Sequence, residues 1–191
     1  MAGKAVLLSI RPRYGEAILL GQKTLEFRRR PPGGDCARVL LYETVPVQRI
    51  VGELQCKAVH SRDPDDLWQL IEYCDELPYI ERDQFDDYFD GCDVAHALEV
   101  TRAGRYCRPV ALAELGVDRA AQSWRYVSQA QLDELQRLVG TPHMLTPSQL
   151  RAELSRSDMP AGREASRSRA LGKIANNVST PSEKGWSCGR R

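Results

Sequence analysis

The first sixty residues alternate between short apolar runs and strong turn signals, a pattern typical of strands joined by short connections. The run Ala5–Ile10 is uninterrupted and stops just before Pro12, so we predict a buried strand there. Apolar residues then recur at helical spacing over residues 12–20, and Gly21 follows at the place of a left-handed C-terminal cap. We therefore predict a two-turn helix after the first strand.

Residues 24–30 alternate strictly, with Leu25 and Phe27 on one face and polar side chains on the other. This pattern predicts a half-buried strand, which a Pro-Pro-Gly-Gly turn separates from the next apolar run. Further strands are predicted over residues 38–44 and 49–60, with Gly52 as a bulge or a point of close approach.

The second half of the chain mixes helical and strand patterns. Helices are predicted over residues 63–76, 82–89, 128–138 and 148–154, and strands over 95–106 and 124–127. We interpret the chain as an α+β protein in which a mostly antiparallel sheet curls into a small, incomplete barrel with flanking helices. The expected domain covers residues 1–140, with a helical insert at about 63–91, and residues 141–191 form a basic tail that is largely disordered from about residue 157.

Charge is distributed unevenly, although the formal net charge is only +1. Residues 1–62 carry 11 basic and 5 acidic side chains, whereas residues 63–99 carry 1 basic and 13 acidic ones. The basic block favours phosphate-bearing partners. The acidic insert is expected to be a solvated face that repels nucleic acid, or a surface that docks another protein.

Several functional classes are excluded by composition. No run approaches the roughly 18 apolar residues of a membrane span, and the N-terminal segment reaches Arg11 without a cleavage-type sequence, so we expect a cytoplasmic protein that binds no membrane. The six cysteines form no C-x-x-C pair, and no histidine stands at a ligand spacing from a cysteine. We therefore expect reduced thiols, no metal and no cofactor.

One motif stands out as candidate chemistry. Residues 21–28 read G-x-K-x-x-E-x-R, so the strand alternation brings Glu26 and Arg28 to one face while the turn at Gly21 directs Lys23 toward them. Such a cluster suits a polar ligand, because Lys and Arg bind phosphate or carbonyl oxygens and Glu accepts from an amine. The alternative is an exposed ladder of salt bridges, which contributes little to the stability of the fold.

The order of several segments resembles the ASCH domain family. These segments are LLSIRPRY at residues 7–14, AILLGQKTLEFRRRPP at 17–32, VLLY at 39–42, IVGE at 50–53, YFDGC at 88–92 and AHALEV at 95–100. The resemblance covers about residues 5–139, and it lies in the ordered combination rather than in the short motif alone.

This resemblance implies a PUA-like β-barrel with a cleft on one side, and a function in binding RNA or modified nucleosides. One branch of the family removes the acetyl group of acetylated cytidine with a Lys and a Thr three residues later. Lys23 matches that Lys, but Glu26 stands where the Thr is expected, which argues against amidohydrolase chemistry because a carboxylate does not replace a hydroxyl nucleophile. Ribonuclease activity is known in another branch.

Further binding residues are predicted around the same cleft. Arg28, Arg29 and Arg30 could follow a phosphate backbone or form an ordinary exposed strand end. Tyr42 could stack on a base or belong to the core. Glu53 is predicted to face the cleft and Ser123 to lie in a loop that covers it.

We therefore expect RNA or a modified nucleoside as the ligand of Lys23, Glu26 and Arg28. A close Glu stabilises the charged form of a Lys, so the Lys23–Glu26 pair favours binding over catalysis. Two alternatives stay open: a hydrolase acting on RNA or an acylated nucleoside, with Lys23 and Glu26 as the catalytic residues and Arg28 as the stabilising cation, and a regulatory module that docks a protein through the acidic helices.

Overall fold

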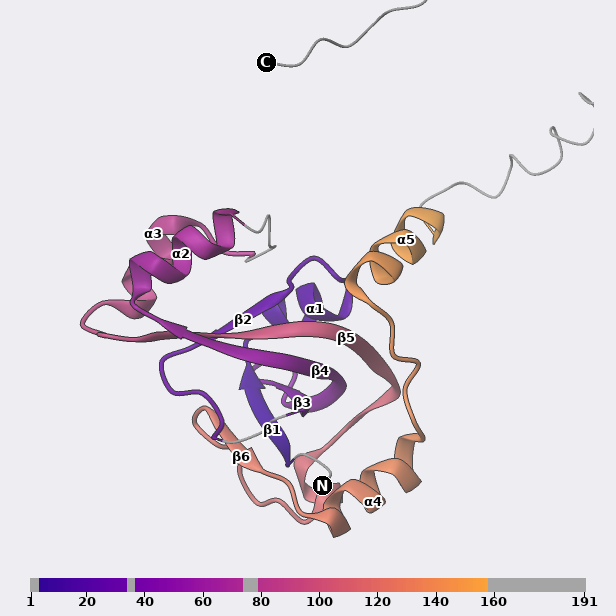
Figure 1. Ribbon diagram of the computed structural model, residues 1–191. Coiled ribbons are helices and arrows are strands. Elements are labelled where there is room, and N and C mark those ends of the chain that lie inside the picture. Colours follow the sequence, from indigo (N-terminus) through magenta and orange to yellow (C-terminus); the bar gives the residue numbers. More distant parts are fainter. Residues whose placement is uncertain (1–3, 34–36, 74–78, 158–191) are drawn as a thin grey trace, which may run out of the picture. The chain divides into compact units, whose positions relative to one another are not determined.

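The computed structural model describes residues 4–33, 37–73 and 79–157 (Figure 1). Its elements are β1 (Ala5–Ile10), α1 (Pro12–Leu19), β2 (Leu25–Arg28), β3 (Arg38–Glu43), β4 (Arg49–Arg62), α2 (Pro64–Tyr73), α3 (Arg82–Phe89), β5 (Ala95–Val110), a 3₁₀ turn (Leu112–Leu115), β6 (Trp124–Tyr126), α4 (Gln129–Val139) and α5 (Pro147–Ser157). Every predicted strand and helix is present: β1 and α3 have the predicted ends, and the others differ by a few residues at their ends. Residues 74–76 of the helix predicted at 63–76 lie outside the described residues. Among the described residues, the 3₁₀ turn was not predicted. The expected disordered tail lies outside the described residues.

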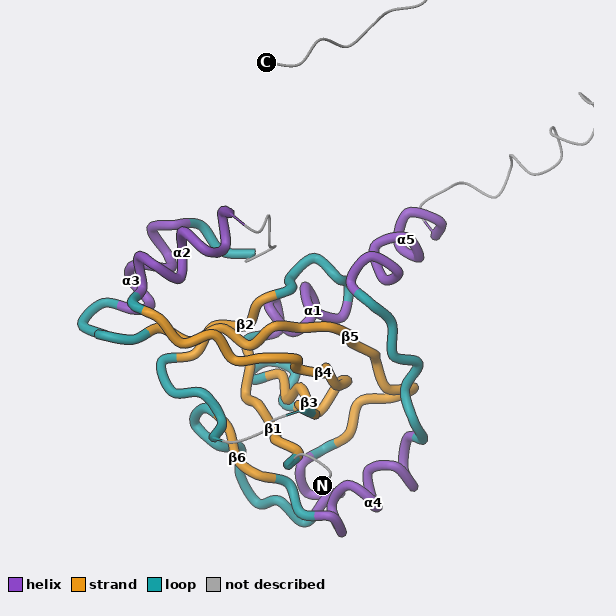
Figure 2. The backbone as a smooth tube through the Cα atoms, in the orientation of Figure 1, coloured by secondary structure: helices purple, strands orange, loops and turns teal. Residues whose placement is uncertain are grey.

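The six strands form one mixed sheet in the order β2-β5-β4-β3-β1-β6. β1 and β3 run parallel, and the other neighbours are antiparallel. Figure 2 shows the sheet curling into a half-barrel, with β4 and β5 crossing it as two long strands. This confirms the predicted α+β class and the incomplete, mostly antiparallel barrel.

The centre of the sheet is buried on both faces. Side chains of β1 and β3 alternate between two clusters, one that packs with Ile18 and Leu19 of α1 and one that packs with Leu135 and Val139 of α4. Such continuous burial explains why Ala5–Ile10 reads as an unbroken apolar run.

Gly52 is a point of close approach between β4 and β5, as predicted. The strand register shifts beside it, and a Cβ atom at this position would lie 2.5 Å from the carbonyl oxygen of Gly104. A larger residue would separate the two longest strands of the sheet.

The helical insert lies between β4 and β5 and packs against β2. Phe27 of β2 makes edge-to-face contacts with Phe85 and Phe89 of α3, with ring centroids 5.3 and 6.3 Å apart. Leu67 and Ile71 of α2 complete this third apolar cluster. Because aromatic pairs of this geometry are stabilising, α3 is held close to the strand that carries the candidate motif.

The chain after α4 also packs against the sheet. Leu145 pairs with Ala103 of β5, Leu150 of α5 contacts the first core cluster, and Arg151 donates to the carbonyl of Gly21. The compact unit that contains these contacts runs to Arg156. Among the described residues, no helix combines the length and apolar character needed to cross a bilayer.

Candidate functional site

The turn after α1 determines where Lys23 lies. Gly21 adopts a φ of 71°, and the amides of Gln22 and Lys23 both donate to the carbonyl of Ala17. A Cβ atom on Gly21 would lie 2.3 Å from the carbonyl oxygen of Pro147. Both the left-handed conformation and the close approach therefore require glycine, and the turn brings Lys23 back over the start of β2.

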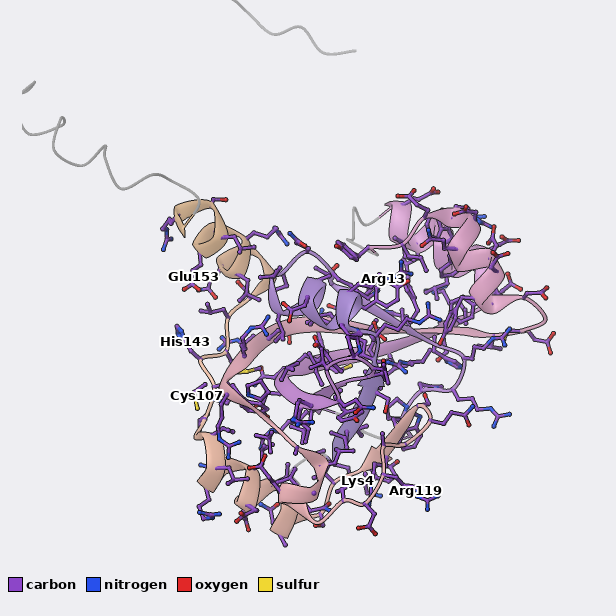
Figure 3. The ribbon with its side chains drawn as sticks, turned by 180° about the vertical axis from the view of Figure 1, so that it is seen from behind. Lys4, Arg13, Cys107, Arg119, His143 and Glu153 are labelled. Carbon is purple, nitrogen blue, oxygen red and sulfur yellow. The ribbon has the colours of Figure 1, made fainter. Side chains whose placement is uncertain are left out.

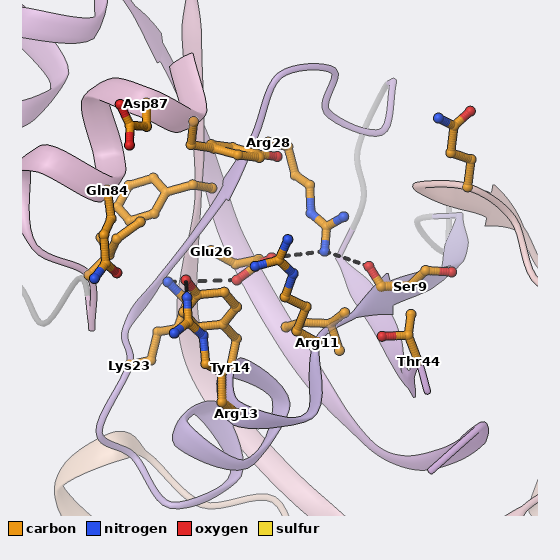
Figure 4. A pocket seen from close by; sticks show the side chains of 15 residues that line it. Ser9, Arg11, Arg13, Tyr14, Lys23, Glu26, Arg28, Thr44, Gln84 and Asp87 are labelled. Atoms are coloured by element: carbon orange, nitrogen blue, oxygen red, sulfur yellow. Dashed lines mark hydrogen bonds and ion pairs between the residues drawn. The ribbon is translucent and has the colours of Figure 1, made fainter. Parts of the chain in front are cut away.

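Strand alternation brings Glu26 and Arg28 together, as predicted. Arg28 Nη2 donates to Glu26 Oε1 and to the carbonyl oxygen of Ser9, each at 2.8 Å, and Lys23 Nζ lies 3.7 Å from Glu26 Oε2 (Figure 4). All three charged side chains are buried, and Lys23 is only 2% exposed. The alternative of an exposed salt-bridge ladder is therefore wrong.

Burial decides the protonation of Lys23. Loss of hydration lowers the pKa of its amine to about 8, and Glu26 opposes this change without cancelling it. The aromatic rings of Phe27 and Tyr14 lie beneath the amine, with centroids 4.6 and 5.3 Å from Nζ. Lys23 is thus a cation at neutral pH that loses its proton only slightly above it.

Arg28 has an unused donor. Its Nε atom is buried and has no hydrogen-bond partner among the described residues. A buried polar group left unpaired costs about 1–3 kcal/mol of stability. A ligand atom that accepts a hydrogen bond from this donor would therefore gain a stabilising contact. The donor belongs to a guanidinium, whose planar fork suits phosphate and carboxylate oxygens.

The three residues line a cavity of about 570 Å³. Four basic side chains line it, Arg11, Arg13, Lys23 and Arg28, together with the acidic side chains of Glu26 and Asp87. Its aromatic lining includes Tyr14 and Tyr88. Positive charge therefore predominates in a space of small-ligand size.

Two groups of cavity residues were not predicted from the sequence. Arg11, Arg13 and Tyr14 come from the start of α1, where the sequence Arg-Pro-Arg-Tyr is a visible basic and aromatic signal. Gln84 and Tyr88 come from α3, which was expected to be a solvated acidic face. The packing of α3 against Phe27 helps to place that face at the cavity.

The remaining predicted site residues lie elsewhere. Arg29 and Arg30 are exposed and do not line the cavity; Arg29 donates to the carbonyl of Asp90, which ties the end of β2 to the end of α3. Tyr42 is buried in the second core cluster. Ser123 lies next to the cavity residue Gln122, and its carbonyl accepts from the amide of Ser9.

Glu53 is buried in a different polar cluster, away from the cavity. Its Oε2 atom accepts from Arg38 Nη2 at 2.6 Å, from Arg38 Nε at 3.0 Å and from the hydroxyl of Tyr106 at 2.6 Å. Burial and the neighbouring carboxylate raise the pKa of Tyr106, so its hydroxyl keeps the donated proton.

The described residues give no sign of a metal site. No cluster of three or more His, Cys, Asp or Glu side chains with metal-binding geometry occurs among them. The ring nitrogen Nδ1 of His96 forms a 2.8 Å hydrogen bond with the hydroxyl of Ser61.

Comparisons with known proteins find ASCH proteins of Zymomonas mobilis among the relatives in sequence and in structure. An ASCH domain-containing ribonuclease of Zymomonas mobilis is 33% identical over 138 residues, which cover 71% of this chain and 90% of that protein. The crystal structure of an ASCH protein from Zymomonas mobilis matches with a TM-score of 0.65 at 28% identity, over 72% of this chain and 97% of that one. A tyrosine-to-phenylalanine variant from the same organism matches with a TM-score of 0.64 at 28% identity, over 71% and 99%. No protein-family model matches the sequence.

Proposed function

Because the chain belongs to the ASCH domain family, we propose that it binds single-stranded RNA in the cavity between α1, β2 and α3. The observation that carries this proposal is the buried Arg28 with its unpaired Nε donor, set among three further basic side chains. A phosphate oxygen would pair that donor and would be attracted to the surrounding charge.

The aromatic lining supports RNA over a free modified nucleoside. Tyr14 and Tyr88 offer rings on which an unstacked base can lie, and single-stranded RNA presents such bases together with phosphates. A nucleoside would use the rings but would bring no phosphate to the Nε donor of Arg28.

The test is the binding of a fluorescein-labelled single-stranded RNA to the full-length protein, followed by fluorescence anisotropy at increasing salt. We expect the logarithm of affinity to fall linearly with the logarithm of salt concentration, with a slope of roughly −0.7 for each phosphate neutralised. Arg13→Gln should weaken binding by about threefold to tenfold, because it removes one cavity cation.

Arg119→Gln is the matched control. Arg119 is exposed, does not line the cavity and lies far from Arg13 (Figure 3). The control should leave affinity unchanged. Equal losses in the two variants, or no RNA binding by the unmodified protein, would contradict the proposal.

Cleavage of the bound RNA is a second candidate function. It is favoured by the name of the Zymomonas relative, a ribonuclease, and by the amine of Lys23, whose pKa of about 8 suits proton transfer near neutral pH. In this reaction Lys23 takes the proton of the ribose 2′-hydroxyl, and the 2′-oxygen attacks the adjacent phosphorus. The bond to the 5′-oxygen breaks, and that oxygen takes a proton from solvent.

Each charged residue then has a distinct role. Arg28 stabilises the negative charge that develops on the phosphate oxygens, and Glu26 positions Arg28 and Lys23. The products are a 2′,3′-cyclic phosphate and a 5′-hydroxyl end.

Mass spectrometry of the products tests this reaction. Cleavage should accelerate as pH rises through about 8, and it should disappear in a Lys23→Ala protein purified in the same way. Cleavage that persists in this variant would identify a contaminating nuclease or a different catalytic group.

A further inference from the structure

Helix α3 presents an unexplained polar face to the cavity. Gln84, Asp87 and Tyr88 have the spacing i, i+3 and i+4, so they share one side of the helix, and all three line the cavity. The buried side of the same helix carries Phe85 and Phe89, which anchor it to Phe27. The polar face is therefore held in place by the apolar one.

Asp87 and Gln84 differ in the hydrogen bonds that their side chains can form with a ligand. A carboxylate such as that of Asp87 only accepts hydrogen bonds, whereas the amide of Gln84 both donates and accepts. Among the described residues, neither side chain forms a hydrogen bond with another part of the protein; the backbone amide of Gln84 donates to Asp83 Oδ1. The two side chains are thus available to a ligand edge that presents a donor.

Tyr88 connects this face to the cationic side of the cavity. Burial raises the pKa of its hydroxyl, although Arg28 and a hydrogen bond with the Arg29 backbone oppose the change. In Figure 4, Gln84 and Asp87 lie on one side of the charged group of Lys23, Glu26 and Arg28, and Ser9 and Thr44 lie on the other. The lining thus separates an acceptor-rich wall from the cations.

We propose that α3 reads the base of the bound RNA and selects bases that carry an exocyclic amino group. This inference rests on the proposed RNA binding. Asp87 accepts a hydrogen bond from the amino group, Gln84 pairs with a neighbouring ring atom, and Tyr88 contacts the base while Arg28 and Lys23 hold a phosphate. A carbonyl oxygen at the place of the amino group would face the carboxylate without a proton between them.

Two pairs of bases test this selection, because each pair exchanges an amino group for a carbonyl oxygen and the adjacent ring nitrogen from an acceptor to an N–H donor. The probes are heptanucleotides of 2′-fluorouridine with one variable central base: cytosine against uracil, and adenine against hypoxanthine. The 2′-fluoro groups remove the attacking hydroxyl, so binding is measured without cleavage. Anisotropy with the full-length protein should show affinities for cytosine and adenine that are about tenfold higher than for their partners.

Asp87→Asn is the decisive variant, because an amide can turn to donate to a carbonyl. The preference should fall below about threefold in this variant, while affinity for the uracil probe is kept or increased. Asp93→Asn makes the same change of charge at an exposed residue outside the cavity lining and should keep the full preference.

The outcomes separate the two proposals. If the unmodified protein binds every probe equally well, or if Asp87→Asn keeps the preference, base selection by α3 is wrong while RNA binding stands. If no probe binds and labelled RNA also fails to bind, RNA binding itself is wrong and the inference falls with it.

Discussion

Two clusters in this protein each pair a buried glutamate with an arginine, and they differ in burial: the Arg28 side chain is 10% exposed and the Arg38 side chain is 34% exposed. In one cluster Glu53 pairs with Arg38 and Tyr106, and in the other Glu26 pairs with Arg28 and Lys23. The guanidinium Nε of Arg38 donates to its carboxylate, whereas the Nε of Arg28 has no partner among the described residues. The first cluster is complete, and the second has a donor left to bind a ligand.

This difference shows how to distinguish structure from function among buried charges. The Glu53 cluster satisfies its polar atoms from within the protein, which is what stability requires. The Glu26 cluster keeps a desolvated amine and an unpaired donor beside a cavity, at a cost in stability, and perturbed groups of this kind are concentrated at functional sites. Substitutions in the two clusters should consequently have opposite effects on stability and on RNA binding.

The largest effect is expected from Glu53→Ala. It removes the carboxylate that accepts from the buried Tyr106 hydroxyl and the counter-charge of Arg38, so the free energy of unfolding should fall by about 2–4 kcal/mol. Urea denaturation followed by circular dichroism measures this loss. RNA affinity should change less than about twofold under conditions in which the variant is folded, and a selective loss of binding would place Glu53 in the binding site after all.

Lys23→Met should have the opposite effect on stability. Burial of the charged amine outweighs its attraction to Glu26, and Glu26 keeps Arg28 as a partner, so the free energy of unfolding at pH 7 should rise by about 1–3 kcal/mol. RNA binding should weaken by about threefold to tenfold in the same protein, because one cavity cation is lost. A destabilised variant would show that the Lys23–Glu26 pair stabilises the fold, as the Glu53 cluster does.

The pH dependence of this gain follows from the sign of the pKa change. The folded protein releases the Lys23 proton at about pH 8, whereas the unfolded chain keeps it up to about 10.5. The stability of the unmodified protein therefore rises between these values, because the unfolded state binds more protons there. The advantage of Lys23→Met should be largest below pH 8 and should shrink above it.

RNA affinity should also depend on the charge of Lys23. Binding is expected to weaken by roughly threefold to tenfold between pH 7 and pH 9.5, as the amine loses its proton. Lys23→Arg is the matched control, since a guanidinium stays charged over this range. Anisotropy at constant ionic strength provides the measurement, and an equal decline in both proteins would assign the pH effect to another group.

The smallest effect is expected at the exposed end of β2. Arg29 and Arg30 lie outside the cavity lining, so Arg30→Gln should reduce RNA affinity by less than about threefold, through loss of general electrostatic attraction alone. Any such loss should vanish at high salt. A larger loss that survives high salt would extend the binding surface along this strand, as the sequence first suggested.

Local patterns in the sequence were sufficient for the elements and for the centre of the candidate site. The alternation of residues 24–30 and the position of Gly21 predicted how Lys23, Glu26 and Arg28 come together. These arrangements depend on neighbours in the chain, which periodicity and turn chemistry describe.

Residues that depend on distant contacts were beyond such reasoning. Glu53 was predicted to face the cleft, but strand pairing places it beside Arg38 and Tyr106, and Tyr106 is 53 residues away. Asp87 reaches the cavity because α3 packs on the distant strand β2, through Phe85 and Phe89 on Phe27. A single sequence shows which face of a helix is apolar, and it does not show what that face will meet.

The most direct test compares the Nε–H groups of Arg28 and Arg38 by nuclear magnetic resonance of the ¹⁵N-labelled full-length protein, with assignments from Arg28→Lys and Arg38→Lys. On titration with single-stranded RNA, we expect the Arg28 Nε–H resonance to shift strongly and to exchange more slowly with solvent, because the unpaired donor gains a phosphate acceptor. The Arg38 Nε–H resonance, already bonded to Glu53, should stay in place. An unchanged Arg28 resonance in the presence of saturating RNA would contradict the assignment of this cavity as the RNA-binding site.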